Sequence, residues 1–278
     1  EYALWMYSTQ AGGDSYLAMA DEALKAIGIS STRLLADYAS VFAVDNKCNA
    51  EVIFALNNNQ TEKLTGGYYW TYYWPSSNVA SGYQMKPVPI YTTQWWNYSD
   101  NFISVLKQSK TKHNDCRVDC NYLEGPYGSS SEGVMNTISC PNKFKGDCST
   151  SMMILDCDLL YYRYAQAVMM DAELKYYQKD YDGAVKSLNL IAKRAYGVDN
   201  FYTEATRDAV LKALCDETLL EFPCEGVVWW TLIRLDKIWD YNPSLAERRA
   251  LNPNILLWPI SASARNKNNK LRQTEGWN

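Results

Sequence analysis

The sequence predicts a mainly helical protein whose helices form hairpins, with a long irregular, loop-rich segment that carries a few short strands. Two observations lead to this fold class. Apolar residues recur with the 3.6-residue period of amphipathic helices in 1–27 and again from about 156 onward. Between them the period fades and turn-forming residues are frequent. We therefore expect one domain over 1–278, with a helical hairpin in 1–27, an irregular aromatic-rich segment in 28–155, and C-terminal helices and a tail in 156–278.

The first hairpin consists of two short predicted helices, over 2–10 and 15–27. Gly12 and Gly13 interrupt the helical pattern between them, and Asp14 is a candidate N-cap for the second helix. The two helices should therefore pack against each other through their apolar faces.

The irregular segment contains two short apolar runs, at 41–44 and 51–56, which predict strands. A stretch as long as 28–155 with little regular structure is usually functional when it lies inside a compact domain. We therefore look for the binding surface here.

The C-terminal region begins with a strong helical pattern over 158–178. One edge of this helix is apolar, while four polar side chains are expected to point mostly outward, namely Arg163, Gln166, Glu173 and Gln178.

Further helices are predicted over about 181–195, which Gly197 ends, and over 203–222, which Pro223 ends because proline cannot continue a helix. A shorter, Trp-rich helix follows over 226–239. The inward face of the second of these helices is expected to carry Val210, Leu211, Leu214, Cys215, Thr218 and Phe222.

Tyrosine and tryptophan are concentrated in one part of the irregular segment. The chain has 10 Trp, 22 Tyr and 6 Phe, and 66–100 is the richest stretch. Flat rings on loops can stack on the apolar C–H face of a sugar, while nearby amides bind its hydroxyls. The sequence thus predicts a ligand-binding surface formed by Trp70, Tyr72, Tyr73, Trp74, Tyr83, Trp95, Trp96 and Asn97. Alternatively the loop folds over the helices and buries its own rings, and a mixture of the two is expected.

Several other kinds of function are disfavoured. The net charge of −4 and the lack of a basic stripe argue against binding to nucleic acid or to an anionic membrane surface. His113 is the only histidine, which argues against the common catalytic triads and most zinc catalysis. Glycine pairs occur without the lysine of a phosphate-binding loop. We predict no catalytic residue, no cofactor and no metal, and hence no enzyme.

Two groups of carboxylates need a structural explanation. Glu217, Glu221 and Glu225 follow one helical face, and such like charges need only solvent or one arginine, such as Arg163 or Arg234. Asp115, Asp119 and Glu124 offer oxygen ligands for calcium, but their spacing matches no calcium-binding loop, which favours a solvated loop.

The sequence does not decide the chemistry of its eight cysteines. Four of them crowd into 116–148, where local disulfides or free thiols fit better than a zinc site, because the combination of Cys-x3-Cys with Cys-x7-Cys departs from the spacing of most thiolate sites.

The helices over 158–178 and 181–195 resemble a tetratricopeptide unit. Small residues occur where the helices must approach closely, and 179–184 lies at the turn. The sequence of this turn is repeated more weakly at 13–18, in the first hairpin. A solenoid needs about three stacked repeats, so the remaining helices must pack against something else.

A set of short motifs also occurs in a fixed order along the chain. Upstream they are Asp37-Tyr38-Ala39 with Phe42, and Glu51-Val52-Ile53-Phe54. The helical region adds Arg163-Tyr164-Ala165-Gln166 with Ala172-Glu173, and Leu188-Asn189-x-Ile191 with Arg194-Ala195. The last motifs are the run from Glu217 through Glu221, Glu225, Gly226, Trp229, Trp230 and Leu232 to Arg234, then Trp258-Pro259-Ile260, and Gln273 with Gly276-Trp277.

Together these motifs resemble the SusD/RagB family of outer-membrane nutrient-binding lipoproteins. The chain departs from the family pattern at four positions, where the family favours charged residues: Gln166, Thr218, Val228 and Thr231. These departures affect the packing of the helices concerned and leave the fold unchanged. Members of the family are longer, so we expect this chain to be the C-terminal portion, without the N-terminal half.

The resemblance implies a cell-surface protein of a Bacteroidetes-type uptake system for nutrients. Such a protein captures an oligosaccharide or polysaccharide without a catalytic step and delivers it to a SusC-like TonB-dependent transporter in the outer membrane. It would be attached to the membrane only through an N-terminal lipid anchor that is absent from this chain. The alternative is a helical protein-interaction module whose aromatic loop binds a peptide or protein partner.

Overall fold

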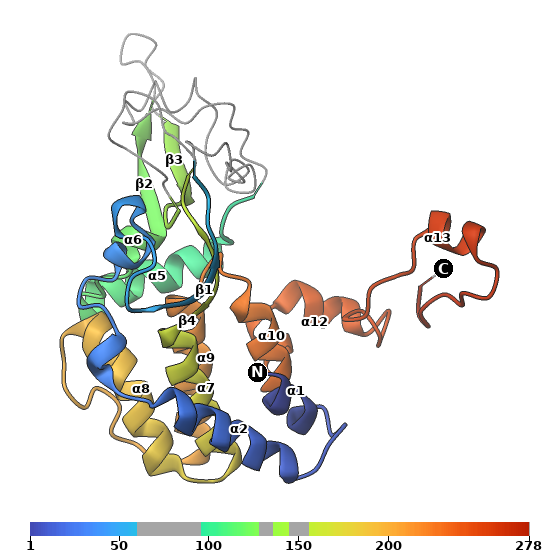
Figure 1. Ribbon diagram of the computed structural model, residues 1–278. Coiled ribbons are helices and arrows are strands. Elements are labelled where there is room, and N and C mark those ends of the chain that lie inside the picture. Colours follow the sequence, from blue (N-terminus) through green and yellow to red (C-terminus); the bar gives the residue numbers. More distant parts are fainter. Residues whose placement is uncertain (60–95, 128–135, 145–155, 278) are drawn as a thin grey trace. The chain divides into compact units, whose positions relative to one another are not determined.

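The computed structural model describes residues 1–59, 96–127, 136–144 and 156–277 (Figure 1). Its described part is mainly helical, with a few short strands in two small sheets, which confirms the predicted fold class. The chain divides into two compact units, Glu1–Val228 and Trp229–Asn278, and each is described by itself.

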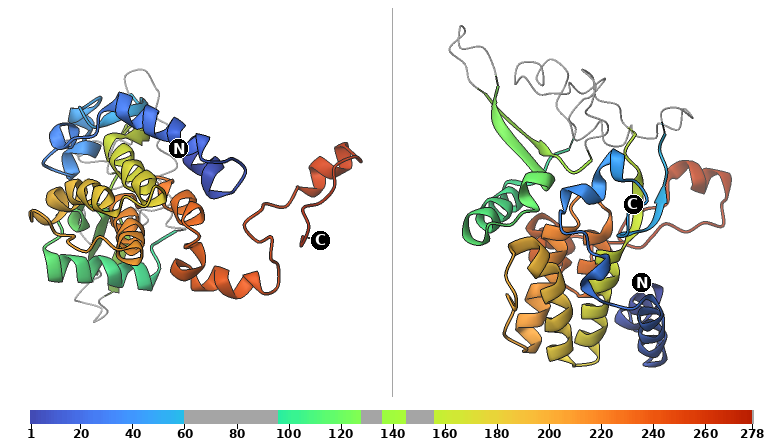
Figure 2. Two further views of the ribbon diagram at one scale, coloured as in Figure 1. Left: turned by 90° about the horizontal axis from the view of Figure 1, so that it is seen from below. Right: turned by 60° about the vertical axis from the view of Figure 1, so that its left-hand side comes forward.

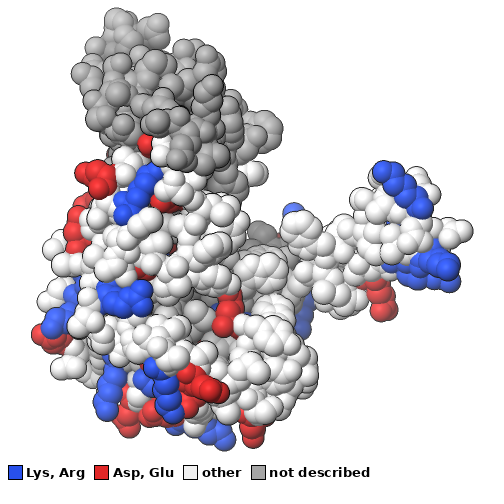
Figure 3. Space-filling view, viewed as in Figure 1, with Lys and Arg blue, Asp and Glu red and all other residues white. Residues whose placement is uncertain are grey.

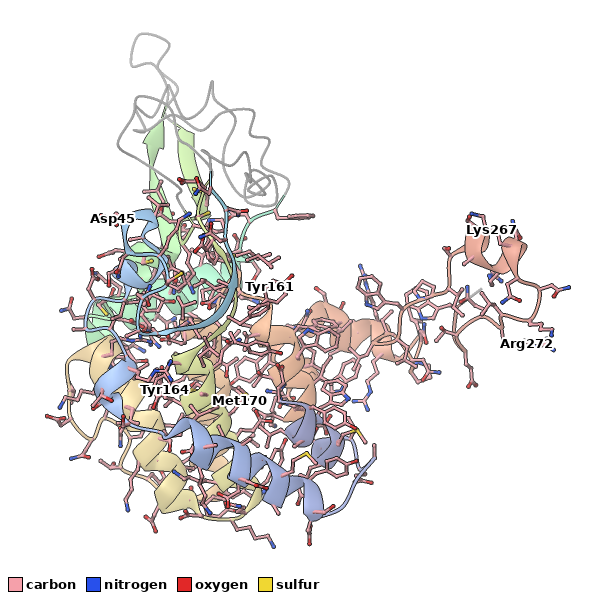
Figure 4. The ribbon with its side chains drawn as sticks, viewed as in Figure 1. Asp45, Tyr161, Tyr164, Met170, Lys267 and Arg272 are labelled. Atoms are coloured by element: carbon pink, nitrogen blue, oxygen red, sulfur yellow. The ribbon has the colours of Figure 1, made fainter. Side chains whose placement is uncertain are left out.

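The N-terminal hairpin consists of α1 (Tyr2–Ser8) and α2 (Ser15–Ile27), as predicted. Asp14 occupies the N-cap position of α2, but its side chain makes no capping hydrogen bond there. The apolar faces of both helices pack against α7 in a cluster formed by Ala3, Leu4, Leu17, Ala20, Leu24, Ala167 and Leu174. Met170 of α7, labelled in Figure 4, packs at the edge of this cluster.

The second hairpin consists of α7 (Tyr164–Tyr177) and α8 (Tyr181–Tyr196), and it has the tetratricopeptide-like form that the sequence predicts (Figure 2). Asp180 caps α8, since its carboxylate accepts a hydrogen bond from the Gly183 N–H at 2.9 Å. Gly197 ends α8 with a φ of 68°, a conformation that glycine adopts without strain.

The next helix, α9 (Arg207–Glu221), begins four residues later than predicted. The side-chain amide of Asn189 donates to the Tyr202 carbonyl at 2.9 Å and accepts from the Tyr202 N–H at 2.8 Å. These two bonds hold the connection extended against α8, and Thr206 then caps α9. The predicted inward face of α9 is confirmed, because all six side chains are buried.

The part of the chain predicted to be irregular contains more regular structure than expected. Its longest element, α5 (Asp100–His113), begins at the Ser99 cap and ends at Asn114 in the left-handed region. The other described elements of this part are η1 (Ser31–Arg33), η2 (Ala39–Phe42), η3 (Val44–Asn46), β1 (Val52–Leu56), α6 (Val118–Asn121), β2 (Tyr122–Tyr127) and β3 (Asn136–Pro141).

The strand predicted over 41–44 is wrong, while the one over 51–56 is confirmed as β1. Val41 and Phe42 are both buried, and the 3-10 turn η2 carries these two neighbours into one core, whereas an isolated strand would point them to opposite faces.

The helix predicted to begin near 158 instead begins at Tyr164, because the preceding residues form β4 (Leu159–Arg163). β4 pairs antiparallel with β1, with Val52 opposite Arg163 and Leu56 opposite Leu159. β2 and β3 form a second antiparallel pair. The partner strand, which is distant in sequence, therefore decides the structure of 159–163.

The second unit contains three short helices after α10 (Val227–Arg234), which crosses the boundary between the units: α11 (Ile238–Tyr241), α12 (Pro243–Arg249) and α13 (Ala262–Lys267). The side chain of Gln273 accepts from the Ile260 N–H at 2.8 Å and donates to the Ile260 carbonyl at 3.3 Å. The Trp277 indole N–H donates to the Leu257 carbonyl at 2.9 Å, so the closing motif folds back on the Trp258-Pro259-Ile260 motif. Among the described helices, none has the length and apolar character needed to cross a bilayer.

Candidate functional site

One end of the first unit carries the described residues that flank 60–95, 128–135 and 145–155 (Figure 1). We call the residues 57–59, 96–98, 139 and 156–158 at this end the rim. The rim includes two residues of the predicted binding surface, Trp96 and Asn97, and the described residues that adjoin 60–95 in sequence.

One side of the rim is built on β2 and β3. The Asn97 side-chain amide donates to the Ser139 hydroxyl at 3.0 Å, and Ser139 lies 3.1 Å from the Tyr122 hydroxyl. The Tyr98 hydroxyl donates to the Asn121 carbonyl at 3.2 Å. These bonds fix the chain at 96–98 to the sheet.

The other side of the rim joins β1 to β4. The Asn58 N–H donates to the Asp158 carboxylate at 3.0 Å, and the Asn58 side chain donates to the Cys157 carbonyl at 2.8 Å. The Lys47 ammonium donates to the Asp156 carbonyl at 2.6 Å and forms an ion pair with Asp158 at 3.1 Å. Two segments about 100 residues apart in sequence are therefore held together here.

Of the predicted binding residues, the structure describes two. Trp96 lies at the rim with 47% of its surface exposed, and Asn97 beside it is also exposed. Their contact with a ligand remains a prediction. The other six lie outside the described residues: Trp70, Tyr72, Tyr73, Trp74, Tyr83 and Trp95.

A buried network of charged groups lies beneath the rim, and Arg163 is its centre. The Arg163 guanidinium contacts Glu51 at 2.8 Å, Glu221 at 2.7 Å and Glu225 at 2.6 Å. Its Nη2 also donates to the Glu221 main-chain carbonyl at 2.9 Å. All four side chains are 0–2% exposed.

Arg117 forms the second centre of the network. Its guanidinium bonds both carboxylate oxygens of Asp115 at 2.9 Å, and it contacts Glu217 at 2.7 Å and Glu221 at 3.2 Å. Arg194 joins the two centres, since it pairs with Glu51 at 2.8 Å and also with Glu221. We call the set of Glu51, Asp115, Arg117, Lys143, Arg163, Arg194, Glu217, Glu221 and Glu225 the ionic core.

The electrostatics of the ionic core act on Glu221 and on a tyrosine bonded to Glu217. Burial alone would raise the pKa of Glu221, but the guanidinium groups of Arg194, Arg163 and Arg117 lower that pKa far below its ordinary value. Burial and the Glu217 carboxylate raise the pKa of Tyr202, whose hydroxyl donates to Glu217 at 2.7 Å.

The ionic core corrects part of the sequence interpretation. Arg163, Gln166 and Glu173 were expected to point outward, yet all three are buried. The Gln166 amide oxygen accepts the Arg163 N–H at 2.7 Å and caps α7, which explains why an amide serves at this position. Arg163, one of the two arginines predicted as a partner for the three glutamates, pairs with Glu221 and Glu225. One arginine is not enough, because Glu217 pairs with Arg117 and Glu221 also pairs with Arg117 and Arg194, whose roles the sequence does not indicate.

Neither group of carboxylates is arranged for catalysis or calcium binding. Glu217 and Glu221 are fully buried and ion-paired, so they cannot contact a substrate. Asp115 pairs with Arg117, Asp119 with Lys110 at 2.7 Å and Glu124 with Lys107 at 2.7 Å. The described residues contain no cluster of His, Cys, Asp and Glu that could hold a metal ion.

Two of the four cysteines in 116–148, Cys120 and Cys140, are buried in the core. Cys120 belongs to the hydrophobic cluster that contains Tyr38 and Phe42, together with Cys157, which lies outside 116–148. Cys148 lies outside the described residues. The buried cysteines act as small apolar side chains in packing.

Charged side chains also lie at the surface of the first unit, where they are spread out instead of being gathered as in the ionic core. Figure 3 shows positive and negative side chains interspersed over the visible face of the first unit, below the grey atoms. This face presents no area of a single charge that would attract a polyanion.

Thr218, one of the four departures from the motif pattern, has a buried hydroxyl whose effect on stability can be tested. The side chain is 1% exposed, and its hydroxyl has no hydrogen-bond partner among the described residues. Since an unsatisfied buried polar group costs about 1–3 kcal/mol, Thr218→Val is expected to raise the free energy of unfolding by about 1 kcal/mol. Urea denaturation followed by circular dichroism measures the change. A loss of stability would mean that a water molecule or an undescribed residue binds the hydroxyl.

Comparison with known proteins identifies the family of the chain. The model of the SusD family matches residues 45–277. The chain belongs to the SusD family. A search among curated proteins finds no match.

Solved structures of SusD superfamily proteins have the same fold. One from Bacteroides fragilis is 23% identical with a TM-score of 0.74, and covers 96% of this chain and 60% of its own. One from Bacteroides vulgatus is also 23% identical, with a TM-score of 0.74, and covers 99% of this chain and 63% of its own. The chain thus spans about three fifths of the length of these structures.

A third structure was solved with a ligand. It is the surface glycan-binding protein A from Bacteroides thetaiotaomicron in complex with laminarihexaose, which is 19% identical with a TM-score of 0.56. The match covers 86% of this chain and 54% of that protein, and at this identity it shows a shared fold alone.

Proposed function

We propose that this SusD-family protein binds an oligosaccharide or polysaccharide at the cell surface, through the aromatic residues of 66–100. The observation that carries this proposal is the concentration of Tyr and Trp in one segment whose described end, Trp96 with Asn97, is exposed at the rim. An exposed indole beside an amide suits a sugar, which presents an apolar face and a ring of hydroxyls. The laminarihexaose complex of a protein with the same fold is consistent with this ligand class.

The proposal includes delivery as well as capture. After binding, the glycan passes to a SusC-like TonB-dependent transporter, and the protein acts at the outer membrane, held there by an N-terminal lipid anchor. No chemical step is required, because the ligand is only held and released. Membership of the SusD family supports this part.

Isothermal titration against a panel of soluble oligosaccharides tests glycan binding. We expect heat with one class of glycan and a loss of about tenfold to a hundredfold in affinity for Trp70→Ala, Trp74→Ala or Trp95→Ala, because a tryptophan at the centre of an interface contributes about 2 kcal/mol or more. Trp258→Ala is the matched control, since Trp258 is 84% exposed and lies in the second unit, outside 66–100.

The outcomes separate glycan binding from the alternatives. If every glycan gave no heat while a peptide or a transporter fragment bound and lost affinity in the same variants, the segment would be a protein-interaction surface. Chromatography of the sugars after incubation would reveal shorter products if the protein were a glycosidase. Co-purification of the full-length protein with its transporter from outer membranes tests delivery.

A further inference from the structure

We propose that Arg163 is a positioning residue for the glycan-binding end, because the ionic core beneath the rim holds the chain segments that carry the rim in one fixed arrangement. The inference rests on the proposed function. Arg163 itself touches no ligand and acts through the segments to which it is bonded.

Four of the segments that lead to the rim carry a member of the ionic core, and the fifth, 96–98, is hydrogen-bonded to Ser139 and Asn121 of these segments. Glu51 directly precedes β1, and Arg163 is the last residue of β4. Arg117 directly precedes α6, which leads into β2, and Lys143 follows β3 by two residues. Arg117, Lys143 and Arg163 each contact one or more of the three glutamates at 217, 221 and 225 directly. Glu51 is linked to Glu221 through Arg163 and Arg194.

The C-terminal end of α9 is the common attachment point. The Glu221 carbonyl accepts hydrogen bonds from the Tyr38 hydroxyl at 2.6 Å, from Arg163 at 2.9 Å and from the Lys143 ammonium at 2.9 Å. The Asn121 side chain donates to the Leu220 carbonyl at 2.8 Å. A helix C-terminus has unsatisfied carbonyls and a partial negative charge, so it favours the donors and cations gathered here.

The geometry of Arg163 allows it to fix the orientation of the segments that it bonds, as well as the distances between them. Its Nη1 bonds Glu51 and Glu221, its Nε bonds Glu225, and its Nη2 bonds Glu225 and the Glu221 carbonyl. The planar guanidinium presents these donors at fixed angles, whereas a lysine ammonium is a single point charge on a flexible stem. Arg163→Lys therefore keeps the charge but removes most of the directional bonds.

A small rotation at the ionic core becomes a large displacement at the rim. β4 has five residues, and at about 3.3 Å per residue it spans about 17 Å from Arg163 toward the rim. A rotation of about 5° at its base would therefore move its far end by about 1.5 Å. Displacements of about 1 Å in a binding site are enough to weaken recognition strongly.

The experiment compares Arg163→Lys with Leu174→Ala. Leu174 is the matched control because it is 1% exposed in the cluster between α7 and the N-terminal hairpin, outside the ionic core. For each variant we would measure the urea midpoint, the affinity for the glycan bound by the wild type, and deuterium uptake in peptides covering 52–58, 96–104, 139–144 and 156–162. All measurements are made at a temperature at which the variants remain folded by circular dichroism.

We expect Arg163→Lys to weaken glycan binding by about tenfold or more and to speed deuterium uptake in all four peptides together. Leu174→Ala should lower the urea midpoint at least as much, yet keep wild-type affinity and wild-type uptake in these peptides. Glu225→Gln, which removes one partner of Arg163 and of Lys143, is the second variant if Arg163→Lys does not fold.

Two results would overturn the inference. The first is wild-type affinity and uptake in Arg163→Lys or Glu225→Gln, and the second is an equal loss of affinity in Leu174→Ala. If the wild type binds no glycan, the proposed function is wrong, and the uptake comparison alone then decides whether Arg163 fixes the rim segments.

Discussion

Replacing Arg163 by methionine is expected to lower the free energy of unfolding by about 3–5 kcal/mol, because it leaves buried carboxylates without their cation. Glu51, Glu221 and Glu225 all contact the guanidinium and are 0–2% exposed, so water cannot replace it. A domain is stable by only about 5–15 kcal/mol in total, so the variant should be partly unfolded at moderate temperature. Urea denaturation followed by circular dichroism measures the loss.

Arg207→Met is the matched control for this prediction. Arg207 is exposed, and its ion pair with Asp208 is long, at 3.5 Å. Exposed pairs of this kind contribute about 0–1 kcal/mol, so the control should remain close to the wild type. Equal stability of the two variants would show that the ionic core contributes little to holding the fold.

Glu221→Gln is expected to destabilise the protein strongly at pH 7 and much less in acid. The folded-state pKa of Glu221 lies far below its ordinary value of 4.5, since three guanidinium groups outweigh the effect of burial. A carboxylate with a lowered folded-state pKa contributes its full stabilisation above the pKa of the unfolded chain and loses it as the pH falls through the folded-state value. The difference between wild type and variant should therefore shrink below about pH 4.5, by about 1.4 kcal/mol per pH unit.

Urea denaturation at pH 7, 4 and 3 checks this dependence. Asp199→Asn serves as the control, because Asp199 is 73% exposed and pairs with an exposed lysine, Lys193. The free energy of unfolding of Asp199→Asn, plotted against pH, should run parallel to that of the wild type. A difference between wild type and Glu221→Gln that stays constant over this range would contradict the assignment of a lowered pKa to Glu221.

Much of the helical scaffold could be predicted because its signals are local. In α8, the Asp180 cap, the face formed by Ala184 and Leu188, and the Gly197 stop are all properties of consecutive residues. The α1–α2 hairpin and the buried face of α9 follow from the same kind of pattern. A helix satisfies its own backbone hydrogen bonds, so such a pattern needs little information from elsewhere in the chain.

The errors occur where partners distant in sequence decide the structure. Leu159–Arg163 continues a helical pattern, yet it is a strand because β1, about 110 residues earlier, pairs with it. The α5 helix was missed, although Ser99 as a cap and the spacing of Phe102, Ile103 and Leu106 carry its signal. Tertiary hydrogen bonding overrides local propensity in the first case.

The candidate site is likewise predictable only where its signals lie along one stretch of the chain. The sequence alone identifies an aromatic segment and the order of motifs of the SusD family, because composition and spacing are visible along one chain. It also shows three glutamates spaced along one helix, and Arg163 as a cation for them. It does not show that Glu51, Arg117 and Arg194 converge on the same point, since these residues are up to 143 positions apart.

The sequence by itself therefore determined the helical hairpins, the family and the segment in which to look for a ligand. Only the tertiary structure decided that Arg163, which the helical pattern places at the surface, is buried at the centre of the ionic core, and that this core lies beneath the rim. The physical reason is that a buried charge is stable only where several partners meet around it in three dimensions.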